Sequence, residues 1–528
     1  MFLRRQITWW LPAVLLLTAG SGAGLAAEVG IWDRFETSIT NTKTYSDPYR
    51  DVTLNVTYTC PDGATVKFWG FYDGGATWKI RFMPDKKGMW RYEATFSDGR
   101  PGKTGSFTCV DSSIPGMIGK DKVNPKWFGY RGGKHVLLRS FHVGDRFFAS
   151  NWSESKRMAF LDWAQGQGYN MLSIGSHYLN RNVQGRGRGW NTPNIWNNNV
   201  RKPQPGEFHK LEAILDDLSA RRILVFPFAG FFGANSDYPK SNGDQTLYIK
   251  YILARIGSYW NCLFNVAGPE LAKWSLSESQ IKSLAEKIQS LDVFDHALSC
   301  HQTKNKNLFK NQSWVDYDCI QGPTTRDLNR LYDDLSSKLR SKKVPSYAHE
   351  TLWAGNKNHP NYTDAQLRKN AYVICMAAAA LNFGDMNGNS SSGFTGSLEL
   401  SDRNQAKHDI VRKVWDFFET VEFWKLSPRP DLVDNGFCLA KPGTEYLVYR
   451  QSRGSINVKI TGGPYKVTWI NAQDTSNRLD GGTISNEKNL NAPNSGDDWL
   501  LHLTKKSSNV SSLAPGDTGS MRKDDLNN

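Results

Sequence analysis

Short runs of alternating polar and apolar residues fill the chain from about Glu28 to Val110. Residues 51–59 alternate one by one, and residues 65–75 end in glycines that suit a turn. A period of two is typical of strands with one buried face, and short strands separated by turns are typical of two packed sheets. The pattern therefore predicts an immunoglobulin-like β-sandwich over residues 28–115.

From about residue 124 to residue 426, apolar runs alternate with segments of helical period. Helices of ordinary length are expected at residues 278–291, 325–338 and 364–378. Such alternation is typical of parallel β/α folds, and about 300 residues with eight strand–helix units favour a closed barrel over an open sheet. We expect a (β/α)8 barrel over residues 120–426. Its predicted strands are residues 135–141, 171–174, 223–228, 263–267, 297–300, 317–321, 345–349 and 378–383.

Alternation of polar and apolar residues returns after Pro430 and continues to Leu503. It predicts a small C-terminal β-sandwich over residues 430–505, which would brace the barrel. Residues 506–528 are mostly Ser, Asn, Asp, Gly and Lys, a composition typical of a disordered tail. The expected fold class is thus multidomain, a (β/α)8 TIM barrel flanked by an N-terminal immunoglobulin-like β-sandwich and a small C-terminal antiparallel β domain.

Residues 1–27 have the three parts of a secretory signal peptide. Arg4 and Arg5 supply positive charge, residues 9–18 form the apolar run, and residues 24–27 are the small residues of a cleavage site. The apolar run is too short to anchor the chain in a bilayer. We expect a secreted or periplasmic protein without integral membrane association.

The chain is basic, with a formal net charge of +14 and a sequence pI near 9.3. Such a balance favours anionic partners. The positive residues are spread along the chain and accompany no nucleic-acid motif, so a nucleic-acid partner is not expected. The charge instead leans towards an acidic glycan.

The cysteines leave two interpretations open. Seven of them in 528 residues are few for a disulfide scaffold. Cys60 with Cys109 and Cys300 with Cys319 are candidate disulfides, or all seven are buried thiols. No CxxC and no His/Cys cluster has the sequence spacing of a zinc site, so no metal is expected. No cofactor is expected either, since phosphate-loop, GxSxG and HExxH motifs are missing from the sequence.

Two apolar runs end on a glutamate, and these glutamates are the candidate catalytic residues. Residues 262–270 end on Glu270, and residues 344–350 end on Glu350. The carboxyl ends of the strands in a parallel β/α barrel form the rim where active sites lie. Two carboxyl groups held there by different strands are the minimum equipment for cleaving a glycosidic bond.

Further residues at or near other predicted strand ends are the candidate substrate-binding residues. A pyranose carries a ring of hydroxyls and needs several converging polar groups, while a flat aromatic ring can stack on a sugar face. Each polar member of the set also fits a purely structural role, and the tryptophan fits core packing equally well. The set is Arg139, His142, His177, Asn265, His301, Asp318, Trp353, Asp385 and Asn387.

Six short motifs resemble those of one group of exported bacterial proteins. Members of this group carry an immunoglobulin-like, DUF5060-like N-terminal domain and a small C-terminal β domain. Between them lies an apiosidase-like or DUF4038-like (β/α)8 barrel of the clan A type of retaining glycoside hydrolases. The resemblance covers nearly the full mature chain. Its motifs are residues 31–36 (IWDRFE), 70–74 (GFYDG), 82–84 (FMP), 88–92 (GMWRY), 265–270 (NVAGPE) and 469–472 (WINA).

The resemblance implies a role for each candidate glutamate. Glu270, after the fourth strand, would be the general acid/base, and Glu350, after the seventh, would be the nucleophile of a retaining double displacement. The clan usually places an asparagine directly before its acid/base. Here that position is Pro269, and Asn265 lies five residues before Glu270.

The sequence therefore predicts a secreted glycoside hydrolase that cleaves a plant or algal polysaccharide, with a lean towards an anionic one. Its partner is a poly- or oligosaccharide substrate. The alternative is a catalytically inactive barrel that serves as a carbohydrate-binding or cell-surface protein, which Pro269 favours. A third interpretation keeps the enzyme class but gives one catalytic role to another acid such as Asp318 or Asp385. The sugar, the linkage and the oligomeric state stay open at this point.

Overall fold

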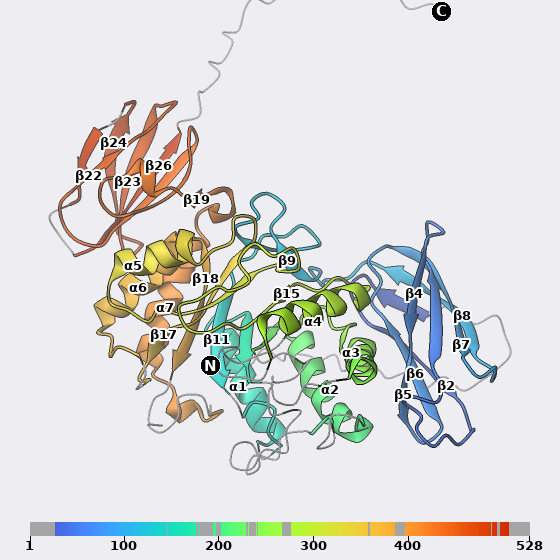
Figure 1. Ribbon diagram of the computed structural model, residues 1–528. Helices are drawn as coiled ribbons and strands as arrows, with labels where there is room; N and C mark the ends of the chain where they lie inside the picture. Colours follow the sequence, from blue (N-terminus) through green and yellow to red (C-terminus); the bar gives the residue numbers. More distant parts are fainter. Residues whose placement is uncertain are drawn as a thin grey trace, which may run out of the picture.

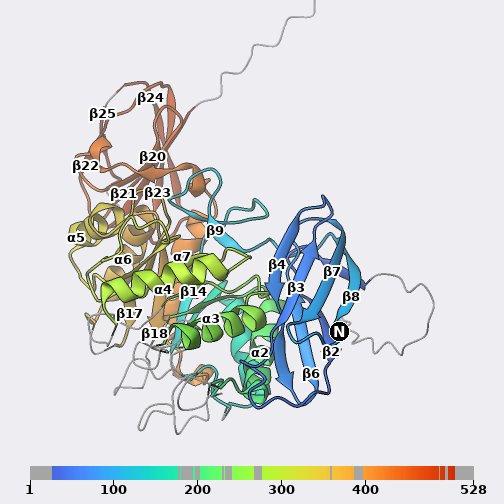
Figure 2. The same ribbon diagram turned by 45° about the vertical axis from the view of Figure 1, so that its right-hand side comes forward.

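The computed structural model of the chain shows three groups of elements, in order along the sequence (Figure 1). The N-terminal and C-terminal strands lie on different sides of a central β/α region in both views (Figures 1 and 2). The structure describes residues 27–144, 146–150, 152–175, 179, 194–196, 202–228, 231, 239, 241–266, 276–356, 359–385, 397–486, 488–493 and 497–505.

The N-terminal part consists of two sheets packed face to face. The rings of Phe35 and Phe107, one from each sheet, stack with centroids 4.2 Å apart, and so do those of Tyr58 and Phe82. The prediction of a strand-rich N-terminal domain is confirmed. One sheet has the order β1 (Ala27–Gly30), β8 (Lys103–Val110), β7 (Gly88–Phe96), β3 (Leu54–Thr59), β4 (Thr65–Trp69); the other has the order β2 (Phe35–Thr40), β6 (Thr77–Phe82), β5 (Phe71–Gly74).

A parallel sheet forms the centre of the β/α region. All five pairings in its six strands are parallel, and the strands curve as a half-barrel (Figure 1). Each of the six is buried almost throughout, as apolar runs between helices require. The order is β13 (Leu224–Pro227), β12 (Met171–Ile174), β11 (Arg139–Gly144), β18 (Ala379–Asp385), β17 (Ser346–Ala354), β16 (Asp318–Gln321).

Two further parallel strands, β14 (Phe264–Asn265) and β15 (Leu298–Ser299), pair with each other. Backbone hydrogen bonds connect them to both edges of the six-stranded sheet. Leu263 donates to the carbonyl of Val225 at 3.0 Å, and Asp316 donates to the carbonyl of Leu298 at 2.9 Å. Strands thus occur at all eight places where the sequence predicts them.

Helices follow most of these strands and carry the local signals that begin a helix. Pro205 is the first residue of α2, where its missing N–H costs nothing. Ser277 and Gln280 form a capping box at the start of α4. The helices are α1 (Glu154–Gly166), α2 (Pro205–Ala220), α3 (Asn242–Ile256), α4 (Glu278–Leu291), α5 (Leu328–Asp333) continuing as the π-helical η5 (Asp334–Lys338), α6 (Asp364–Met376) and α7 (Gln405–Phe418).

The last part of the chain forms a six-stranded antiparallel sheet with a separate two-stranded ribbon. The buried carboxylate of Asp498 ties it to the β/α region, accepting two bonds from Arg368 of α6 at 2.8 and 3.1 Å and one from Tyr449 at 2.7 Å. The sheet order is β19 (Ser427–Pro428), β20 (Phe437–Lys441), β21 (Glu445–Arg450), β26 (Trp499–Lys505), β23 (Tyr465–Asn471), β24 (Arg478–Ile484), and the ribbon is β22 (Ser455–Val458) with β25 (Lys488–Asn491).

All seven cysteines are buried free thiols. The disulfides considered for Cys60 with Cys109 and for Cys300 with Cys319 are therefore wrong for this structure, and the alternative of buried thiols holds. Among the described helices, none combines the length and the apolar character that crossing a bilayer requires. The predicted signal peptide lies outside the described residues except for Ala27.

A buried network of charges joins the N-terminal sheets to α2 and α3, which lie beside them in Figure 2. The carboxylate of Glu212 on α2 accepts two bonds from Arg81 of β6, at 2.9 and 3.0 Å. It accepts two more from Arg255 of α3, at 2.6 and 3.1 Å. Arg255 also donates to Asp73 of β5 at 2.6 Å. The carboxylate of Glu212 thus pairs with one buried guanidinium group from each domain, Arg81 from the N-terminal sheets and Arg255 from α3. These buried ion pairs connect the two domains.

Glu212→Gln should lower the free energy of unfolding by about 3–5 kcal/mol, because it removes the negative charge that two buried arginines share and leaves Arg81 only Glu36 and Arg255 only Asp73 as charged partners. Urea denaturation followed by tryptophan fluorescence measures the loss. The matched control is Glu286→Gln, whose carboxylate is half exposed on α4 and pairs loosely with Lys282 at 3.8 Å. The control should change stability by no more than about 0.5 kcal/mol. Equal effects of the two substitutions would contradict the assigned role of Glu212.

The same carboxylate should make stability depend on acid. Burial raises the pKa of Glu212, but the charges and hydrogen bonds of Arg81 and Arg255 outweigh it and lower the pKa from 4.5 to about 2. A depressed carboxyl pKa stabilises the fold above the unfolded pKa, and this contribution is lost as pH falls through the folded value. Wild type should therefore lose part of its stability between about pH 4.5 and 2, and Glu212→Gln should lose less over that interval. Denaturation curves at stepped pH measure the difference, and parallel pH profiles would refute it.

Candidate active site

Glu350 lies inside β17, at a break in its pairing with β18. From Ala348 to Leu352, β17 advances four residues while β18 advances two, so two extra residues bulge from the ladder. Glu350 has φ of 50°, in the left-handed region that costs a side-chain-bearing residue about 1–2 kcal/mol. Its N–H donates to the side-chain oxygen of Asn382 at 3.3 Å. Backbone strain held in place in this way is typical of functional sites.

The carboxylate of Glu350 is buried, with 4% of the side chain exposed. Its Oε2 accepts a hydrogen bond from the amide of Gln321, the last residue of β16, at 2.8 Å. The same oxygen lies 3.3 Å from Nε2 of His301, which follows β15, and 3.7 Å from Nδ1 of His349. Groups from β17 and from the carboxyl ends of β15 and β16 thus surround one carboxylate.

These partners decide its charge. Burial alone raises the pKa of a carboxyl group. The hydrogen bond from His301 and the nearby histidines outweigh it and hold the pKa of Glu350 well below its ordinary range. Burial lowers the pKa of His142 to about 4 and that of His349 far below its usual value. At neutral pH Glu350 is therefore an anion next to two neutral imidazoles.

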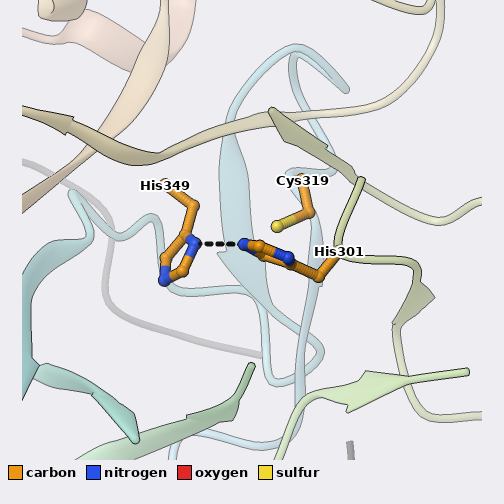
Figure 3. Close-up of side chains that lie close together, drawn as sticks. All are labelled: His301, Cys319 and His349. Carbon is orange, nitrogen blue, oxygen red and sulfur yellow. Dashed lines mark hydrogen bonds between the residues drawn. The ribbon is translucent and has the colours of Figure 1, made fainter. Parts of the chain in front are cut away.

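A chain of hydrogen bonds runs from this carboxylate into the centre of the β/α region. Nε2 of His301 and Nδ1 of His349 are 2.9 Å apart, as Figure 3 shows. Nε2 of His349 is 2.7 Å from Oγ of Ser173, and that hydroxyl is 3.3 Å from Nδ1 of His142. The ring of Phe228 packs against all three imidazoles, with centroids 5.4–5.6 Å away. Four strands therefore fix the rings beneath Glu350.

Trp353 packs its buried ring against this cluster, 4.8 Å from the ring of His142. It has room only because residue 384 is a glycine, since a Cβ there would lie 2.2 Å from the indole. Trp353 is thus a wall of the site that supports His142. Asn265, at the end of β14, donates to the carbonyl of Pro227 at 3.1 Å, and among the described residues its side-chain oxygen has no hydrogen-bond partner.

Two candidate substrate-binding residues lie away from this site. Arg139 is the first residue of β11 and donates to Asp416 of α7 at 2.7 Å. Asp318 is the first residue of β16 and accepts bonds from Ser341 and Asn307 at 2.6–2.7 Å. Both sit at the amino ends of their strands. The strand predicted over residues 135–141 starts four residues before β11, which begins at Arg139, whereas the strand predicted over residues 317–321 differs from β16 by one residue. Their contacts fit a structural role.

Asp385, the last residue of β18, accepts from Nε2 of His408 at 2.9 Å and from the backbone N–H of Asn404 at 2.8 Å. These two hydrogen bonds hold the start of α7 against the end of β18. The remaining candidates Glu270, His177 and Asn387 lie outside the described residues. The predicted pairing of Glu270 with Glu350 therefore stays a prediction.

Four residues of the site escaped sequence reasoning, namely Gln321, Ser173, His349 and Asn382. Gln321 and His349 carried a usable signal, since one ends a predicted strand and the other directly precedes Glu350. A possible metal-ligand set also escaped it. The ring nitrogens of His301 and His349 and the sulfur of Cys319 all lie within 4.8 Å of one another (Figure 3).

Comparison with protein families assigns two parts of the chain. Residues 142–391 match the apiosidase-like catalytic domain, and residues 28–97 match DUF5060, a domain of unknown function. Two parts of the chain are therefore similar to a DUF5060 domain and to an apiosidase-like catalytic domain, as the sequence motifs suggest. Among curated protein sequences, none matches the chain.

Solved structures with the same fold are glycoside hydrolases by description. A candidate glycoside hydrolase from Bacteroides vulgatus ATCC 8482 superposes with a TM-score of 0.70 at 18% identity, covering 90% of this chain and 100% of its own. A family 5 glycoside hydrolase from the same organism has a TM-score of 0.55 at 13% identity, covering 74% of this chain and 93% of its own. At such identities the similarity shows the fold alone, which this chain shares with these two structures.

Gly384→Ala should test the wall formed by Trp353. The new methyl group meets the indole, so we expect a loss of about 1–3 kcal/mol in the free energy of unfolding and a changed tryptophan spectrum. Gly206→Ala, in α2 where nothing lies within 4 Å of the added carbon, is the control. It should leave stability unchanged or raise it by up to about 1 kcal/mol. A Gly384→Ala protein as stable as the control would show that the ring is not confined.

Proposed function

We propose that the protein is a secreted glycoside hydrolase that cleaves a plant or algal poly- or oligosaccharide by a retaining double displacement, with Glu350 as the nucleophile. The observation that carries the proposal is the buried, ionised carboxylate of Glu350, which lies within β17 beside the carboxyl ends of β15 and β16, inside an apiosidase-like domain. The features of residues 1–27 support export.

A closed (β/α)8 barrel is part of this proposal. Support comes from the backbone bonds that connect β14 to β13 and β15 to β16, at the two edges of the six-stranded sheet. In such a barrel the carboxyl ends of all eight strands face one rim. Residue 270, which follows β14 in sequence, would then reach the rim that Glu350 occupies.

The protonation state of Glu350 suits a nucleophile. In the first step its oxygen would attack the anomeric carbon while the bond to the leaving oxygen breaks and Glu270 gives that oxygen a proton. In the second step Glu270 would take a proton from water, which displaces Glu350. A nucleophile must be unprotonated, and Gln321 and His301 keep Glu350 so. Gln321 and the backbone partner Asn382 also fix where its oxygens point.

The substrate class follows from the family description and the composition. An apiosidase-like domain makes glycosides of apiose the first substrates to test. The net charge of +14 favours apiose-bearing chains that are acidic. A screen of acidic and neutral plant and algal glycans for release of reducing ends then defines the sugar and the linkage.

Glu350→Gln and Glu350→Ala should each reduce kcat by roughly 10⁴-fold or more while the protein still folds, because the covalent step loses its nucleophile. Turnover is measured on the best substrate of the screen, and folding by circular dichroism and thermal unfolding. Glu419→Gln, a half-exposed carboxylate beyond the end of α7, is the matched control and should keep full activity.

A small anion such as azide should restore turnover to Glu350→Ala and give a product of inverted configuration, because it can attack the anomeric carbon in place of the missing carboxylate. Glu270→Gln should retain more activity on substrates whose leaving group needs no proton than on substrates whose leaving group must be protonated. Wild-type turnover by Glu350→Gln would rule out the proposed nucleophile.

A second candidate function rests on Pro269, which stands where clan members carry an asparagine. In that case the barrel binds glycans without cleaving them. Retention of wild type on immobilised glycans, together with no release from any of them, would favour this function over hydrolysis.

A further inference from the structure

The side chains of His301, Cys319 and His349, here called the His–Cys–His cluster, converge from three different strands. Cys319 lies in β16, His349 in β17, and His301 follows β15. All three are buried, with at most 1% of each residue exposed. Figure 3 shows the two rings meeting through their nitrogens, with the sulfur of Cys319 directed towards the same space. Strands far apart in sequence thus supply two imidazoles and one thiol to one point.

The spacing of the donor atoms fits a small divalent cation. Zinc binds nitrogen at 2.0–2.1 Å and sulfur at about 2.3 Å in a tetrahedron, so its donor atoms lie roughly 3.3–3.6 Å apart. Here the two nitrogens are 2.9 Å apart and all three donors lie within 4.8 Å of one another. Shifts of well under 1 Å for the nitrogens would therefore produce coordination distances.

A neighbouring group holds one of the ligands in the orientation that a metal requires. Metal-binding histidines usually donate their second ring N–H to a hydrogen-bond acceptor, which fixes the tautomer. Oγ of Ser173 lies 2.7 Å from Nε2 of His349 and can accept that proton. Nδ1 of His349 then presents a lone pair to His301 and Cys319.

We propose that the His–Cys–His cluster is a binding site for Zn²⁺ or a cation of similar borderline softness. Nε2 of His301, Nδ1 of His349 and the sulfur of Cys319 are its ligands. Soft thiolate combined with imidazole selects such cations over Mg²⁺ or Ca²⁺. The thiol gives its proton to solvent as the metal–sulfur bond forms. The cation replaces the direct hydrogen bond between the two histidines.

The position of the site gives the metal an effect on Glu350. Its Oε2 is 3.3 Å from Nε2 of His301, which would be a ligand. A bound cation takes this nitrogen away from Glu350 and places positive charge beside the carboxylate. Glu350 then becomes a ligand or an ion-pair partner and loses nucleophilicity. Zinc should therefore inhibit turnover, a consequence that rests on the proposed function.

Titration of the metal-free full chain with Co²⁺ and Zn²⁺ tests the site directly. Co²⁺ should produce the near-ultraviolet band of thiolate-to-cobalt charge transfer. Addition of Zn²⁺ should abolish this band by displacing the cobalt, and the displacement should be complete when one Zn²⁺ is bound per chain. Calorimetry should show tighter zinc binding as pH rises, because the thiol must lose its proton. Cys319→Ser should remove the band and weaken zinc binding by roughly 100-fold. Removing a residue that only supports a metal ligand already weakens metal binding by about 10–100-fold, so the loss of a ligand should cost at least as much.

Cys262→Ser is the matched control, since Cys262 is an equally buried thiol next to β14 and is outside the cluster. It should keep both the band and the affinity. A second variant, His301→Gln, guards against misfolding of Cys319→Ser and should also lose the band. Absence of the band in wild type, or equal zinc affinity in wild type and Cys319→Ser, would overturn the proposal and leave the cluster as a metal-free hydrogen-bonded pair.

These measurements need no substrate, so the site and the proposed function can fail separately. Zinc binding without inhibition would count against the role of Glu350, not against the metal site. Inhibition that persists in Cys319→Ser at the same zinc concentration would count against the metal site.

Discussion

One buried negative charge organises the candidate active site. A carboxylate out of reach of water needs hydrogen bonds or positive neighbours to remain ionised. For Glu350 these come from Gln321 and His301, on two strands other than its own. The requirement extends inward, because His301 contacts His349 and His349 contacts Ser173. The bulge in β17 and the wall of Trp353 are understandable as ways to hold this charge beside the carboxyl ends of β15 and β16.

The strand pattern of the central region could be predicted from the sequence because its apolar runs are short and separated by helices. Glu278–Leu291 was predictable to the residue, since apolar positions recur with helical period and Ser277 caps the start. The length of β17 was not, and it continues four residues beyond Glu350. The bulge depends on how β17 pairs with β18, and the sequence of β17 by itself does not determine the register of that pairing.

The same dependence on contacts between distant parts of the chain explains which residues of the candidate site could be predicted from the sequence. Glu350, His142 and His301 could be nominated because each closely follows an apolar run. Arg139 was nominated near the end of a strand predicted over residues 135–141, whereas β11 begins at Arg139. Asp318 was nominated within a strand that was predicted to one residue, and it opens that strand at the end away from Gln321. Ser173 and Asn382 were missed because nothing in the local sequence distinguishes a hydrogen-bonding side chain of the site from any other buried polar residue. Only the folded chain brings them to Glu350.

The charges shared by Arg81, Glu212 and Arg255 bear on how this architecture can be dissected or recombined. A β/α region expressed without the first hundred or so residues would lose Arg81, which leaves Glu212 paired with Arg255 alone, and would expose the ring of Tyr251 on α3 that Phe71 covers. The N-terminal sheets thus form the outer layer that covers α2 and α3. Gene fusions that exchange the N-terminal sheets would have to preserve the ion pairs of Glu212 with Arg81 and Arg255. The residues on both sides of this junction must therefore be kept together.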